Sequence, residues 1–151
     1  MSQHIKKQLY NACRIFLQER LDAVHDIIAS VQESLESETK SSAGDKHETG
    51  RAMLQLEREK AGKQLAALQQ QEELLAKVSI EGSSEVIRLG SLVATNKGMF
   101  FIGISKGLIR LEKQDYFAIA PNAPIGQLLL GKKVGDTFSF NGNDFQIIQI
   151  E

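Results

Sequence analysis

The feature that most constrains the fold is an apolar stripe that runs through residues 5–38 without a single proline or glycine. Apolar residues recur there at intervals of three to five, namely Leu9, Cys13, Phe16, Leu21, Val24, Ile28, Val31 and Leu35. This spacing indicates one face of a long α-helix. In a second stripe, Leu54, Ala61, Leu68 and Leu75 repeat every seven residues among Glu, Lys, Arg and Gln. Together the stripes predict an antiparallel coiled-coil hairpin of two helices over residues 1–78.

The stretch between the two stripes, SSAGDKHETG at residues 41–50, carries two carboxylates three residues apart. Asp45 as a helix N-cap with Glu48 three positions later matches a capping box, and Glu48 also suits the positive end of the helix dipole. The same spacing puts both carboxylates on one helix face, where they offer hard oxygen ligands to a divalent cation. Two carboxylates do not complete the coordination sphere of such a cation, so further ligands would have to come from elsewhere. The spacing alone leaves both interpretations open.

The pattern changes at residues 79–84, a Ser- and Gly-containing linker, and short β-rich runs follow in residues 85–151. The predicted strands are Val86–Leu89, Leu92–Thr95, Met99–Ile104, Leu108–Leu111, Thr137–Phe140 and Phe145–Ile150. Asn141-Gly142 predicts a tight hairpin turn between the last two, because Gly and Asn tolerate positive φ. A proline near its start and a glycine at its end predict a short helix over residues 124–131. The chain is therefore expected to be α+β, with a small strand-rich second domain.

Composition excludes several classes of function. The formal net charge is −1, so the basic surplus of a duplex-binding protein is absent. A lone cysteine, Cys13, forbids an internal disulfide and fits a reducing cytosol. No signal peptide or membrane span is expected from the apolar runs. His47 lies beside the two carboxylates, but no spaced His/Cys set for zinc and no phosphate-binding glycine loop is present. Nothing in the sequence forms a complete active site by itself.

The order of these parts resembles the bacterial Gre transcript-cleavage factors. The sequence from Pro124 to Gly126, the segment LLGKKVGD at residues 129–136 and the closing strand at 145–150 read much like the end of that family. Gly44, Asp45 and Glu48 match its Gly-Asp-x-x-Glu pattern at the tip of the helical hairpin. The resemblance covers essentially the whole chain, thinly in the helices and better in the last third.

The resemblance implies a fold and a mechanism. The second domain would be FKBP-like and would dock on RNA polymerase at its secondary channel, with Asn122 and Pro124 in the contacting region. The coiled coil would carry Asp45 and Glu48 to the polymerase active site, where they share a second Mg²⁺ and orient the water that cuts backtracked RNA. The chain would be an accessory factor rather than an enzyme, a cytoplasmic monomer that meets nascent RNA and DNA only through the elongation complex.

The tip also departs from the family pattern, which has an apolar residue, an Asn and a Tyr where this chain has Lys46, Thr49 and Ala52. Ala123 stands where the family has a Ser before the loop proline. These differences point to an alternative, a Gre-like regulator that occupies the channel without stimulating cleavage. Two further alternatives are a prolyl isomerase, which needs an aromatic pocket, and a structural adaptor whose acidic tip is only a helix cap.

Overall fold

The protein is α+β, as the sequence predicts, with two long helices followed by a six-stranded mixed sheet. The computed structural model describes residues 2–40 and 45–151, except for the side chains of residues 2, 39, 40 and 45–48. Helix α1 spans Ser2–Lys40 and helix α2 spans Asp45–Ala76. A third, short helix, α3, spans Pro124–Leu129.

The chain divides into two compact units. The two-helix unit is Leu17–Glu72, and the sheet unit combines Met1–Phe16 with Glu73–Glu151. Helix α1 therefore contributes its first turns to the sheet unit and its remainder to the two-helix unit. The domain division expected from the sequence, with residues 1–78 and 85–151 joined by a linker at 79–84, stays a prediction.

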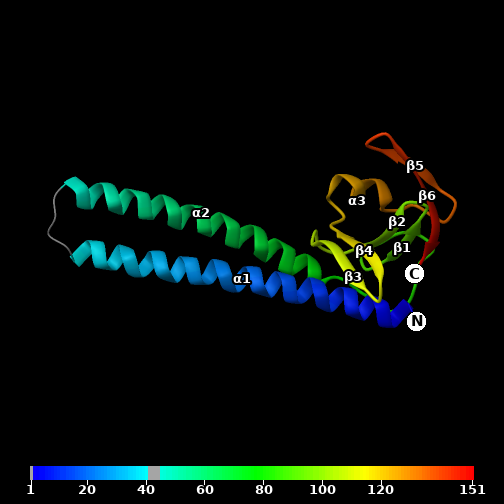
Figure 1. Ribbon diagram of the computed structural model, residues 1–151, viewed down its shortest axis with the longest axis horizontal. Helices are drawn as coiled ribbons and strands as arrows, with labels where there is room; N and C mark the ends of the chain where they lie inside the picture. Colours follow the sequence, from blue (N-terminus) through cyan, green and yellow to red (C-terminus); the bar gives the residue numbers. More distant parts are fainter. Residues whose placement is uncertain (1, 41–44) are drawn as a thin grey trace. The chain divides into compact units, whose positions relative to one another are not determined.

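In the two-helix unit, α1 and α2 run side by side (Figure 1). Their buried apolar residues form one seam. The seam consists of side chains that are at most 7% exposed, namely Leu17, Leu21, Val24, Val31, Ala61 and Leu68. All of them except Leu17 belong to the stripes read from the sequence, which had Phe16 in place of Leu17. An amphipathic helix gains most of its stability from burying such a face, because isolated helices are marginal in water.

The sheet has the strand order β3-β4-β2-β1-β6-β5. Its strands are β1 (Leu92–Thr95), β2 (Gly98–Ile102), β3 (Gly107–Leu111), β4 (Gln114–Ile119), β5 (Thr137–Phe140) and β6 (Asn143–Ile150). Neighbouring strands are antiparallel except β2 and β4, which pair in parallel from Met99↔Tyr116 to Ile102↔Ile119. The predicted Asn141-Gly142 turn is confirmed, with φ values of 52° and 78°.

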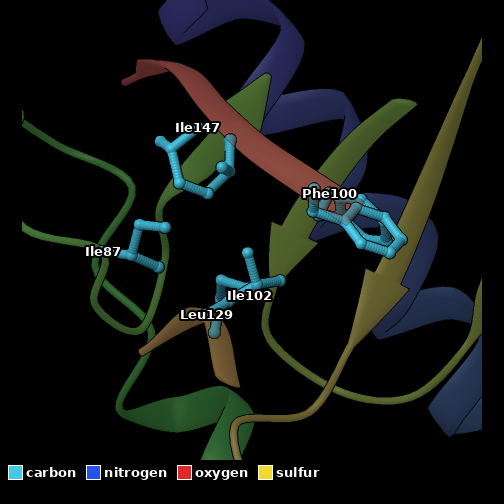
Figure 2. Packing of buried hydrophobic residues seen from close by; sticks show 7 residues of the cluster. Ile87, Phe100, Ile102, Leu129 and Ile147 are labelled. Carbon is cyan, nitrogen blue, oxygen red and sulfur yellow. The ribbon is translucent and has the colours of Figure 1, made fainter. Parts of the chain in front are cut away.

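Side chains on the two sheet faces form separate packing layers. Val93, Phe100, Ile102 and Ile147 form one cluster with Leu129 of α3 (Figure 2). Strand alternation sends the fully buried Phe101 to the other face. Leu9 and Cys13 of α1 are also fully buried in this unit, and Cys13 makes a backbone hydrogen bond with Ile104. The first turns of α1 are thus part of the core that supports the sheet.

Two strand predictions were wrong. Strand β4 was not predicted, because the turn before it consists of Glu112 and Lys113, which adopt positive φ values of 48° and 69° without Gly or Asn. The segment Val86–Leu89 is not a strand: Val86 makes only an isolated bridge with Lys133, and Ile87 points into the core.

Candidate functional site

The predicted acidic pair lies at the beginning of α2, which starts at Asp45. Glu48 follows within the first helical turn. Both residues therefore lie at the end of the two-helix unit where α1 ends and α2 begins. Gly44 falls outside the described residues, and the side chains of Asp45 and Glu48 do as well. Thr49 and Ala52, on the next turn, are exposed. Among the side chains that are described, no three His, Cys, Asp or Glu residues converge as metal ligands.

Of the predicted docking residues, Asn122 lies in the loop that leads into α3 and Pro124 is the first residue of that helix; both are exposed. Two hydrogen bonds hold the loop. The Ala123 backbone N–H donates to the Ala120 carbonyl at 3.1 Å, and the side-chain Nε2 of Gln127 donates to the Asn122 carbonyl at 3.0 Å. Pro124 occupies the first turn of α3, where its missing N–H costs no helical hydrogen bond. Asn122 and Pro124 are therefore presented on a fixed loop of the sheet unit.

A string of aromatic rings crosses the sheet on the α3 face. Ring centroids are 5.8 Å apart for Phe117 and Phe100, 6.2 Å for Phe100 and Phe145, and 4.9 Å for Phe145 and Phe138. At one end Phe117 is 39% exposed, and its cross-strand partner Leu108 is 52% exposed. Phe100 and Phe145 belong to the buried core of the sheet unit, so only the Phe117 end of this string reaches the surface. Only the tertiary structure shows which of these rings are neighbours.

Burial shifts three titratable groups in the sheet unit. It raises the pKa of the Cys13 thiol to about 11, against a partial opposing effect of the Ile104 backbone hydrogen bond. Burial also lowers the pKa of Lys6, an effect that the charge of Arg88 reinforces and that of Glu151 opposes. Tyr116 has a raised pKa, again from burial first and then from nearby carboxylates. A thiol this protonated is a poor nucleophile, so Cys13 is a core residue.

One surface was not found by the sequence analysis. A groove of about 470 Å³ lies between α1 and α2 in the two-helix unit. Its lining includes Arg20, Ala23 and Val24 of α1 and Gln64, Ala67 and Leu68 of α2. We call it the α1–α2 groove. The available signal was the residues beside the apolar stripe, which apart from Arg20 are small or uncharged where they line the groove.

Among the described residues, no helix combines the length and the apolarity needed to cross a membrane. Comparison of the chain with protein-family models, with curated proteins and with solved structures gives no match.

Proposed function

We propose that the protein is a Gre-type accessory factor of bacterial RNA polymerase that stimulates cleavage of backtracked RNA. The observation that carries the proposal is that α2 begins at Asp45, which puts Asp45 and Glu48 at the turn end of two long helices. Within the two-helix unit, residues 17–40 of α1 and 45–72 of α2 extend over roughly 40 Å at 1.5 Å per residue. An acidic pair at the end of such an arm is suited to reach a recessed site in another protein.

The finer description of the fold belongs to the same proposal. The two-helix unit is a coiled-coil hairpin, which the burial of Ala61 and Leu68, seven residues apart on α2, supports. The sheet unit is an FKBP-like domain that docks on the polymerase through the loop with Asn122 and Pro124. The exposure of both residues on a fixed loop supports this role.

Asp45 and Glu48 would supply carboxylate oxygens to a Mg²⁺ that the polymerase also ligates. A cation held there stabilises the charge that develops during phosphodiester hydrolysis. The carboxylates would also accept hydrogen bonds from the attacking water and so orient it. Because residues at positions i and i+3 of a helix share a face, we expect a single approach of the arm to deliver both.

The test is a stalled, backtracked elongation complex with Mg²⁺, in which release of the RNA 3′ fragment is measured. The wild-type protein should accelerate cleavage, and the Asp45→Asn/Glu48→Gln variant should lose that effect while still binding polymerase. Asp22→Asn on α1 is a matched control, because it removes one carboxylate from the same unit away from the turn. Equal cleavage by wild type and by the double variant would exclude the role of the acidic pair.

A second candidate is a regulator that occupies the channel without cleavage. The residues at positions 46, 49 and 52 favour it, because Lys46, Thr49 and Ala52 replace the side chains that accompany the acidic pair in the Gre family. This candidate predicts polymerase binding and changed elongation rates without released 3′ fragments. In either case we expect a cytoplasmic protein that acts as a monomer and reaches RNA and DNA only through the polymerase.

A further inference from the structure

Strand β5 forms an open edge of the sheet. It pairs with β6 alone, at the end of the strand order, and carries no charged residue and no proline (Figure 1). Charged residues and prolines protect many edge strands, because an unprotected edge is a template for a further strand. The opposite edge strand, β3, carries Arg110 in an ion pair with Asp115 at 3.6 Å. The two edges of the sheet therefore differ in chemistry.

The hydrogen bonds of β6 show which backbone groups of β5 point away from the sheet. Thr137 lies opposite Gln146 of β6, and Ser139 lies opposite Asp144. Both of these β6 residues direct backbone groups toward Asn96, on their other side: the Asn96 N–H donates to the Gln146 carbonyl, and Asn96 Nδ2 donates to the Asp144 carbonyl, both at 3.2 Å. In an antiparallel pair, two opposite residues exchange both backbone hydrogen bonds or neither. The N–H and C=O groups of Thr137 and Ser139 therefore point outward, and no partner for them is found among the described residues.

The side chains beside this edge form a hollow with an acidic wall. It has a volume of about 340 Å³ and is lined by Thr137, Phe138, Ser139 and Asp144. Ser139 Oγ donates to Asp144 Oδ1 at 2.6 Å, which holds the carboxylate beside the small serine side chain. In the described part of the chain, no lysine, arginine or histidine pairs with this carboxylate. The hollow therefore suits a positively charged side chain.

The other face of β5 has different chemistry. Side chains alternate along a strand, so Phe138 lies on the face opposite to Thr137 and Ser139. The Phe138 ring stacks on Phe145 with centroids 4.9 Å apart, and Lys132 Nζ lies 5.9 Å from the Phe138 centroid. A strand added beside β5 therefore meets an acidic group on one face and an aromatic ring with a cation on the other. The matching segment alternates Lys or Arg with an apolar residue.

We propose that β5 binds an extended segment of a partner protein, antiparallel to β5, in which a Lys or Arg side chain reaches the Asp144 carboxylate and an apolar neighbour packs beside Phe138. The outward backbone groups of Thr137 and Ser139 form the hydrogen bonds, as in β-strand addition. A segment residue opposite Ser139 lies about 10 Å from Asp144, two strand spacings away, and a long basic side chain spans this distance over the small serine. Strand β5 of a second copy has the sequence TFSF and brings no cation, so the charge favours a different partner.

The experiment adds a short fluorescein-labelled peptide of alternating Lys and Val to the full chain and measures its affinity by fluorescence anisotropy. N-methylation of the Lys residues blocks the peptide edge that faces Ser139 in antiparallel pairing, whereas N-methylation of the Val residues blocks only the outer edge. A peptide with Glu in place of Lys tests the charge. We expect the Lys-methylated and Glu peptides to bind at least about tenfold more weakly, and the Val-methylated peptide to bind within about twofold of the unmodified one.

Two aspartate variants locate the binding site. Asp144→Asn removes the charge but keeps an oxygen that accepts from Ser139, and it should weaken binding of the Lys–Val peptide about fivefold. Asp115→Asn is the matched control, because it removes one exposed carboxylate at the other edge of the sheet; it should change the affinity less than about twofold. In NMR spectra of the full chain, the amide signals of Thr137 and Ser139 should shift on titration, and their hydrogen exchange should slow.

The inference fails if the unmodified peptide does not bind, if the Lys-methylated peptide binds as tightly as the unmodified one, or if the shifted amides lie on β3. Equal affinity for the Lys and Glu peptides excludes a basic partner. If sedimentation shows self-association, and the Thr137 and Ser139 amides are protected from exchange without peptide, the occupant is a second copy and the proposed partner is excluded. These measurements use neither the acidic pair of α2 nor polymerase, so they do not depend on the proposed function.

Discussion

Replacement of Gly90 by alanine tests how the end of α2 is joined to the sheet. Gly90 has a φ of +93°, and a Cβ added there would lie 2.0 Å from the backbone carbonyl oxygen of Ser79. Its own N–H donates to the Ile102 carbonyl at 2.7 Å, so the residue has little room to move. The segment after α2 therefore rests directly on a strand-connecting turn, at a distance that only glycine allows.

The expected cost has two parts. A left-handed conformation in a non-glycine residue costs roughly 1–2 kcal/mol. Forcing apart two packed backbone segments adds about 1–3 kcal/mol, the usual range for overpacking. Gly107→Ala is the matched control, because Gly107 has a φ of +90° and nothing within 4 Å of its would-be Cβ. The change in unfolded-state entropy is the same in both variants and cancels in the comparison.

Urea unfolding followed by tyrosine fluorescence is the appropriate assay. The chain has two tyrosines and no tryptophan, and both Tyr10 and Tyr116 belong to the sheet unit. We expect the free energy of unfolding to fall by about 2–5 kcal/mol for Gly90→Ala and by about 1–2 kcal/mol for Gly107→Ala. If the two variants lose the same free energy of unfolding within about 0.5 kcal/mol, the close approach to Ser79 adds no destabilisation, and the reasoning is refuted.

Three further predictions concern the sheet unit. Leu129→Ala should cost about 2–5 kcal/mol in urea unfolding, because Leu129 is fully buried, whereas Leu130→Ala, at 39% exposure, should cost under 1 kcal/mol or so. Burial raises the pKa of Cys13 from 9.0 to about 11, so the folded state favours the neutral thiol. As the pH rises from 9 to 11, the free energy of unfolding of wild type should therefore fall by about 2–3 kcal/mol relative to that of Cys13→Ala. Unfolding measured at each pH checks this. Lys106 Nζ lies 5.1 Å from the centroid of the Phe16 ring, so Lys106→Gln should cost about 0.5–1 kcal/mol in thermal unfolding and Lys106→Arg should retain most of it. A Gln variant as stable as the Arg variant would contradict the cation–π contact.

The sequence by itself determined the local elements. Both long helices were predicted from the spacing of apolar residues, at intervals of three to five in residues 5–38 and of seven from Leu54 to Leu75. Such periodicity is a property of one segment alone. Asn141-Gly142 predicted its turn for the same reason: the required backbone angles are intrinsic to those two residues. Asp45 and Glu48 were also found locally, from their spacing beside a helix start.

Only the tertiary structure decided which segments share a core. Leu9 and Val24 belong to one stripe in the sequence, yet Leu9 is buried in the sheet unit and Val24 in the seam with α2. Strand β4 pairs in parallel with β2, although β3 lies between them in the sequence. No local sequence pattern encodes this pairing. The α1–α2 groove likewise exists only when two helices lie together. Long-range pairing depends on burial summed over the whole chain, whereas periodicity and turn chemistry act within a few residues.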